Sequence, residues 1–120
     1  MIETDRAEKR CRGNTALNLP MVLGPIAVAH NVEGVPDLNL TAELIAQIFT
    51  GDITRWNDPA LTALNPGAAL PDLRIIVVGR SDDSGTTKAL TTYLATVAPK
   101  AWPYEPEETW PLRGGQSGDG

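Results

Sequence analysis

The spacing of hydrophobic residues predicts a helix over residues 41–51, in the stretch TAELIAQIFTG. Apolar side chains recur there at helical spacing between Leu44 and Phe49. Thr41 precedes them as an N-cap, and Gly51 follows them as a stop signal. We expect one face of this helix to pack on a sheet.

A second, shorter helix is predicted in DPALTAL. Asp58 is placed to cap it and Pro59 occupies its first helical position, where a missing N–H costs little. The turn sequence Asn65-Pro66-Gly67 ends it.

The hydrophobic pattern then changes to that of a strand and back to that of a helix. LRIIVV, residues 73–78, is β-branched without polar alternation, which predicts a strand buried on both faces of a parallel sheet. An earlier apolar segment, MVLGPIAVAHN at 21–31, is predicted to be extended, with Gly24-Pro25 as a bend or edge position. A final helix follows, closed by Pro99, whose packed face is expected to carry Ala89, Leu90, Tyr93, Leu94 and Val97.

The order of strand, helix, helix, strand and helix predicts an α/β fold. At 120 residues the chain suits one domain. We divide it into a polar lead-in at residues 1–18, beginning with the helix-like ETDRAEKR, and a partial domain at 19–120. The charged N-terminus lacks the apolar core of a signal peptide, so either the protein is cytoplasmic or its exported start lies upstream. The aperiodic GGQSGDG at the other end suggests a cut chain.

Composition narrows the classes of function. Fifteen acidic residues against ten basic ones, a net charge of -5, argue against a nucleic-acid partner. The longest apolar stretch, 20–29, is about half the roughly 20 residues that a membrane-spanning helix needs. We expect no cofactor and no metal, because Cys11 is single and the Glu105, Glu107 and Glu108 cluster lacks metal-type spacing. His30 is expected to be hydrogen-bonded or exposed.

The stretch RSDDSGTT, between the second predicted strand and the last helix, carries the candidate chemistry. The helix start offers unpaired N–H groups and a positive dipole to an anion. Arg80 can present a planar fork to two oxygens of a tetrahedral oxyanion, and Asp82 can orient it. The remaining donors are Ser84 and Thr86, through their hydroxyls, and Gly85, through close approach of its backbone.

Two other interpretations of this cluster stay open. Ser84 can simply cap the helix, with Arg80 and Asp82 forming a surface pair worth about 0–1 kcal/mol. A hydrolase or phosphoryl-transfer enzyme using Ser84 is disfavoured, since the chain has neither a GxSxG elbow nor a histidine placed beside it. No Walker motif or GxGxxG fingerprint is present.

From about residue 17 to its end the chain resembles the phosphate-binding proteins of bacterial phosphate ABC transporters. The resemblance is carried by IFTGDITRWNDPALTALNPG, by LPDLRIIVVGRSDDSGTT and by TWPLRGGQSGDG. It implies a periplasmic-binding-protein-like (type II), two-lobed α/β fold that closes over one phosphate without catalysis. The family motif Arg-x-Asp-x-Ser-Gly-Thr falls on Arg80, Asp82, Ser84, Gly85 and Thr86, of which Asp82 holds the arginine and the others bind phosphate.

The resemblance also implies partners and a location. These are inorganic phosphate and the permease subunits of an ABC transporter, on the periplasmic or extracellular side, with membrane association only through the transporter or an upstream lipid anchor. Asp83 departs from the family by standing where many relatives have glycine, and we expect it to face solvent. The chain corresponds to about half of one lobe plus the crossover, so the alternative is a truncated fragment without independent ligand binding. Such a fragment would leave a sheet edge uncovered and tend to self-associate.

Overall fold

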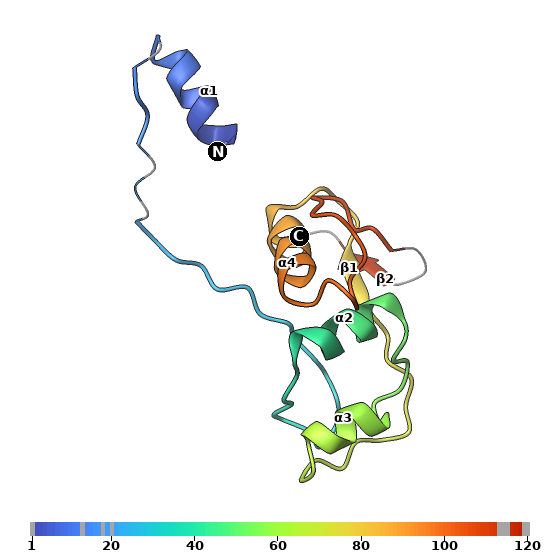
Figure 1. The fold of residues 1–120 in the computed structure, drawn as a ribbon. Coiled ribbons are helices and arrows are strands. Elements are labelled where there is room, and N and C mark those ends of the chain that lie inside the picture. The colour runs from blue at the N-terminus through green and yellow to red at the C-terminus, as the bar shows by residue number, and fades with distance from the viewer. Residues whose placement is uncertain (1, 13, 18, 20, 113–115, 119–120) are drawn as a thin grey trace.

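The computed structural model describes residues 2–12, 14–17, 19, 21–112 and 116–118, and it places α1 (Ile2–Arg10) away from the other elements (Figure 1). Two short strands pair in parallel, with residue 78 opposite residue 116 and residue 80 opposite residue 118. Parallel pairing beside helices agrees with the predicted α/β class. The remaining elements are α2 (Ala42–Thr50), α3 (Pro59–Leu64), β1 (Val78–Arg80), α4 (Gly85–Val97) and β2 (Gln116–Gly118).

Helices α2 and α3 begin and end where the sequence predicts. Thr41 Oγ1 accepts a hydrogen bond from Leu44 N at 3.2 Å, and Gly51 closes α2 in the left-handed region with φ 87°. Asp58 Oδ1 accepts from Ala60 N at 2.9 Å at the start of α3. Local capping chemistry therefore fixes both helices.

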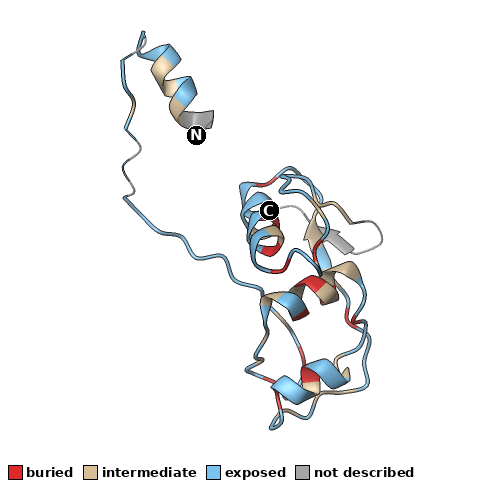
Figure 2. Ribbon diagram, viewed as in Figure 1, coloured by how far each residue is buried: buried red, intermediate tan, exposed pale blue. Residues whose placement is uncertain are grey.

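Two hydrophobic clusters make up the core, and α2 contributes to both because it lies between α3 and α4 (Figures 1 and 2). The first cluster consists of Leu44, Ile48, Ile53, Leu61 and Ile75. The second consists of Ala46, Leu94, Ala98 and Trp102. The second cluster lies against α4 and so positions the loop that precedes this helix.

The prediction of a strand buried on both faces over residues 73–78 is wrong. The strand begins only at Val78, and Ile76 is 64% exposed whereas Ile75 is buried. Ile75 N instead donates to Thr54 O at 2.8 Å, next to an isolated antiparallel bridge between residues 55 and 74. Alternate side chains face the first cluster and solvent, because helices cover one side of this segment and not the other.

The first predicted extended segment forms no strand between residues 21 and 31. Its apolar side chains are largely exposed, and Leu23 reaches 91%. The lead-in, by contrast, is helical in α1 as its sequence indicates. No helix in the described part of the chain is both long and apolar enough to span a bilayer.

The packed face of α4 also differs from the prediction. Leu94 is fully buried as expected, but Tyr93 and Val97 are about half exposed. Two threonines, Thr87 and Thr91, take the buried positions instead. Thr91 can be buried because its hydroxyl is hydrogen-bonded to the backbone of Glu107, in a loop that covers this face.

Candidate functional site

The five residues predicted to form an anion site lie together where β1 runs into α4. Arg80 is the last residue of β1, and Gly85 is the first residue of α4. Asp82 and Ser84 lie in the short loop between them. β1 therefore ends, with Arg80, at the loop that leads into the positive end of the α4 dipole.

Ser84 caps α4 and is buried. Its backbone is extended, and its Oγ accepts from Thr86 N at 3.2 Å. Its carbonyl accepts from Lys88 N at 3.0 Å, which starts the helical ladder. An oxygen that accepts from Thr86 keeps its own hydroxyl hydrogen for another acceptor. Capping and ligand donation by Ser84 are therefore compatible.

Arg80 and Asp82 form the predicted pair. Arg80 Nε donates to Asp82 Oδ1 at 2.8 Å, and a terminal N–H of the guanidinium donates to Asp82 Oδ2. The Arg80 hydrogen bond lowers the pKa of Asp82 below its ordinary value of 3.8. A bidentate contact fixes the plane of the guanidinium, which has five N–H donors in a rigid fork.

Gly85 and Thr86 face open space at the start of α4. Both are exposed, and a Cβ built on Gly85 would meet no atom within 4 Å. The glycine is thus not required by packing within the described chain. An approaching ligand would find the backbone there accessible.

A second segment, residues 107–109, is tied to this loop. Ser84 N donates to Glu108 O at 3.0 Å, and Thr109 Oγ1 donates to Asp83 Oδ1 at 2.7 Å. Asp83 is exposed as predicted, but it is hydrogen-bonded across 26 residues rather than simply solvated. The Ser84 amide donates to Glu108 O and the Thr86 amide donates to Ser84 Oγ, so the Gly85 amide is the candidate backbone donor to an anion.

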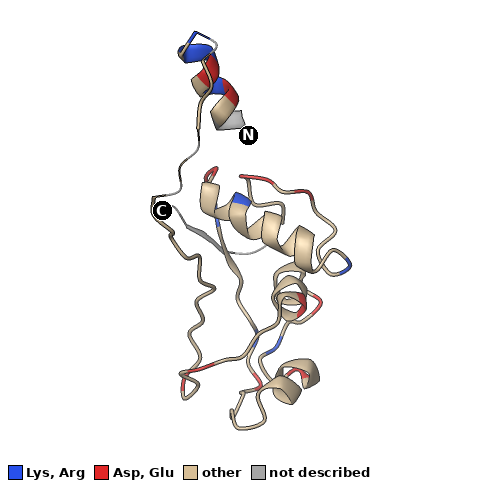
Figure 3. Cartoon of the chain, turned by 60° about the vertical axis from the view of Figure 1, so that its left-hand side comes forward, with Lys and Arg blue, Asp and Glu red and all other residues tan. Residues whose placement is uncertain are grey.

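Sequence reasoning missed this segment because no local signal marks it. Glu105, Glu107 and Glu108 are all exposed, and Glu108 also pairs with Lys88 Nζ at 3.1 Å. Figure 3 shows acidic residues in the loop that precedes α4 and in the segment that runs beside this helix. Any anion must therefore be held by local donors rather than by the long-range field of the protein.

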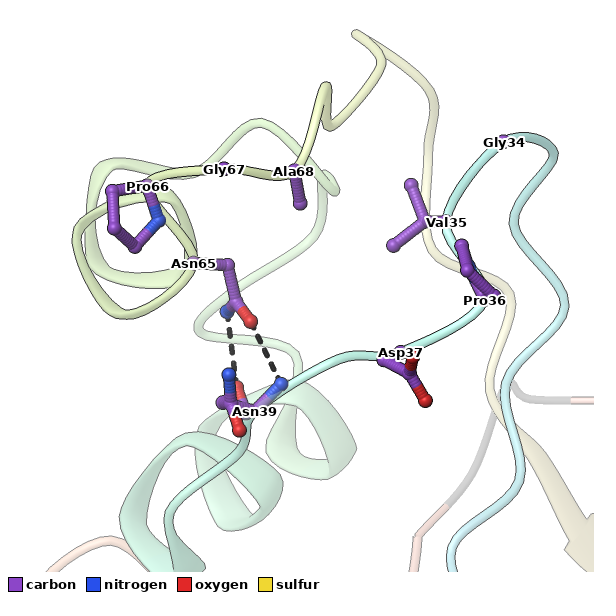
Figure 4. Close-up of a pocket in the computed structure, with 9 residues that line it drawn as sticks. All are labelled: Gly34, Val35, Pro36, Asp37, Asn39, Asn65, Pro66, Gly67 and Ala68. Carbon is purple, nitrogen blue, oxygen red and sulfur yellow. Dashed lines mark hydrogen bonds between the residues drawn. The ribbon is translucent and has the colours of Figure 1, made fainter.

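Elsewhere, a pocket of about 280 Å³ lies between the loop around residues 34–39 and the turn after α3 (Figure 4). Asn65 organises it: its side chain accepts from Asn39 N at 2.7 Å and donates to Asn39 O at 3.0 Å. No motif in the sequence predicts a site there. The pocket is lined by Gly34, Val35, Pro36, Asp37, Asn39, Asn65, Pro66, Gly67 and Ala68.

Trp102 and His30 both lie against other aromatic rings. Trp102 is buried in the second cluster, and its ring lies near those of Tyr104 and Trp110. His30 is half-buried near the ring of Trp56, and its Nδ1 is buried without a hydrogen-bond partner in the described structure. Neither of the two states expected for His30 is therefore found. The described residues contain no group of three metal-ligating side chains.

Residues 1–119 match the family described as "PBP superfamily domain". The chain is 50% identical over 100 residues to the phosphate-binding protein PstS 3 of Mycobacterium tuberculosis, covering 83% of this chain and 27% of that protein. It is 45% identical over 108 residues to the phosphate-binding protein PstS 2 of the same species, a match that covers 90% of this chain and 29% of that protein. It is 46% identical over 84 residues to the phosphate-binding protein PstS of Pasteurella multocida, a match that covers 68% of this chain and 24% of that protein. The chain spans about a quarter of the length of these relatives, all of which are named for binding.

Proposed function

Because the chain belongs to the PBP superfamily and has a periplasmic-binding-protein-like fold, we propose that it binds inorganic phosphate as part of a transport solute-binding protein. The observation that carries the proposal is the cluster at the start of α4. There Asp82 holds Arg80 in a bidentate contact beside the capped helix end. Relatives named as phosphate-binding proteins support the choice of phosphate among anions.

The cluster suits a tetrahedral oxyanion with no catalytic step. Arg80 would donate to two phosphate oxygens, and Ser84 and Thr86 would each donate a hydroxyl hydrogen. The amide of Gly85, an exposed residue, would add a donor at the positive end of α4. Hydrogen bonds to a charged group contribute about 1.5–3 kcal/mol each, so a few such donors suffice for specific binding.

In the proposed function the ligand is handed on rather than transformed. We assign the chain to a two-lobed protein that delivers phosphate to the permease subunits of an ABC transporter from the periplasmic or extracellular side. The resemblance in sequence and the names of the relatives support this assignment. Membrane contact would then come through the transporter or a lipid anchor.

One observation favours a second candidate, in which the 120-residue chain does not hold phosphate by itself. The chain spans about 27% of the length of PstS 3. A site completed by residues outside this chain would bind weakly in the chain alone, because affinity depends on all donors acting together.

Thermal unfolding of the 120-residue chain with and without inorganic phosphate tests both candidates. A ligand that binds only the folded state stabilises it by mass action, so phosphate at 100 times its Kd adds about 2.7 kcal/mol. We expect Arg80→Ala to abolish the rise in Tm. Arg74→Ala, which removes an exposed arginine outside the cluster, should preserve it.

Equal phosphate stabilisation of Arg80→Ala and the unsubstituted chain would overturn the site assignment. A Tm of the unsubstituted chain that phosphate leaves unchanged would favour the second candidate.

A further inference from the structure

We infer that Asp83 is a positioning residue for the anion cluster, acting through the segment 107–109. The inference rests on the proposed function, since it says how Ser84 is held for phosphate. Asp83 lies between the arginine-binding Asp82 and the capping Ser84, so a contact at Asp83 acts directly on the loop that carries both.

The segment 107–109 is fastened to α4 and to the loop that precedes it at three successive residues. Glu107 N donates to the hydroxyl of buried Thr91 at 3.1 Å, and Glu108 O accepts from Ser84 N at 3.0 Å. Thr109 Oγ1 donates to Asp83 Oδ1 at 2.7 Å. The first contact fixes the segment on the helix, whereas the other two tie it to the loop of the anion cluster.

These contacts determine which Ser84 group can reach a ligand. Donation from Ser84 N to Glu108 O commits that amide to the segment and sets the direction of the Ser84 backbone. In this orientation Oγ accepts from Thr86 N and caps α4. If Thr109 released Asp83, the loop would gain freedom around residue 83, and Ser84 would spend part of its time away from the cap geometry.

The contact between Thr109 and Asp83 also explains how the Asp83 carboxylate is accommodated beside an anion site. A carboxylate facing the ligand would repel phosphate. Here the Asp83 carboxylate accepts from Thr109, on the segment 107–109, which keeps it oriented toward that segment. The hydrogen bond of residue 83 and its negative charge therefore make separable contributions to phosphate binding.

NMR measurements of amide hydrogen exchange at Ser84 test whether Asp83 holds the Ser84 backbone in place. The unsubstituted chain and its variants are compared in the absence of phosphate. We expect Asp83→Ala and Thr109→Val to speed Ser84 exchange by about two- to tenfold, the range that one net hydrogen bond supplies. Asp83→Asn keeps an acceptor oxygen and Thr109→Ser keeps the hydroxyl, so both should exchange as the unsubstituted chain does. The double variant Asp83→Ala/Thr109→Val should exchange no faster than either single variant, because the two residues share one contact.

Phosphate titration of the same variants tests the positioning role. Asp83→Ala and Thr109→Val should weaken phosphate binding by a fold-change similar to their exchange effect, with little change in Tm. Asp83→Asn should bind phosphate at least as tightly as the unsubstituted chain, with any gain disappearing at high salt.

The outcomes separate this inference from the proposed function. Ser84 exchange that is unchanged in Asp83→Ala and Thr109→Val overturns the inference, whatever phosphate does. Faster exchange with unchanged phosphate affinity also overturns it and leaves a purely structural contact. If the titration shows no phosphate binding by the unsubstituted chain, this contradicts phosphate binding by the chain itself and also the positioning role of Asp83.

Discussion

Trp110 lies against Gly79, and its ring occupies the space that a side chain at residue 79 would need. A Cβ built on Gly79 would stand 3.0 Å from each of three atoms of the indole ring. The same ring contacts Phe49 edge-on, with centroids 5.2 Å apart. Trp110 thereby joins β1, which delivers Arg80 to the site, to the second hydrophobic cluster.

Gly79→Ala should therefore destabilise the fold. The added methyl would force the Trp110 ring to move, and overpacking of this kind costs about 1–3 kcal/mol. Urea denaturation followed by tryptophan fluorescence would measure the loss in the free energy of unfolding. Gly67→Ala is the matched control, since nothing lies within 4 Å of its built Cβ. Equal stability of the two variants would contradict the close contact.

Asn65→Ala should destabilise the loop that precedes α2. Asn65 is buried, and its side chain pairs with both backbone groups of Asn39 and donates to Leu61 O at 2.9 Å. Its removal loses these three hydrogen bonds, each with a net contribution of about 0.5–1.5 kcal/mol, while water can reach the groups left at the exposed Asn39. Asn57→Ala, at an exposed asparagine, is the comparison. Differential scanning calorimetry should show a much lower Tm for Asn65→Ala than for Asn57→Ala.

The parts of the fold that sequence predicted correctly depend on contacts within a few residues. Thr41, Asp58 and Ser84 cap their helices through bonds that span two or three positions. The strand over 73–78 was mispredicted because its burial depends on which elements cover each face, and the run of β-branched residues does not contain that information.

The same division applies to the candidate site. Arg80 and Asp82 are two residues apart, so their pairing could be anticipated from the motif. Thr109 is 26 residues from Asp83, and a threonine in a proline-rich and glutamate-rich loop gives no signal of where its hydroxyl will donate. The proximity of these residues was thus predictable, whereas the segment that is hydrogen-bonded to them was not.

Helix α4 offers a direct test of the corrected packing face. Leu94→Ala should cost about 2–5 kcal/mol, because Leu94 is fully buried and its loss leaves a cavity against α2. Val97→Ala removes a side chain that is 56% exposed and should cost far less. Both substitutions truncate an aliphatic side chain to alanine in the same helix, so urea denaturation compares a buried position with an exposed one. Similar losses in the free energy of unfolding would support the packed face that the hydrophobic periodicity predicted, in which Val97 is buried.

The pair formed by Arg80 and Asp82 should show itself in the titration of the carboxylate. The Arg80 hydrogen bond lowers the pKa of Asp82 in the folded chain below 3.8. The contribution of this contact to stability is therefore present above that ordinary value and is lost as the pH falls through the lowered folded pKa.

NMR titration of the Asp82 carboxyl carbon should place its midpoint below 3.8, and Arg80→Ala should move the midpoint upward. Arg55→Ala, whose arginine pairs with Asp72 instead, should leave the Asp82 curve in place. An Asp82 midpoint that does not respond to Arg80→Ala would show that the guanidinium is not held by this carboxylate, and the phosphate site would then lose the residue assigned to orient its arginine.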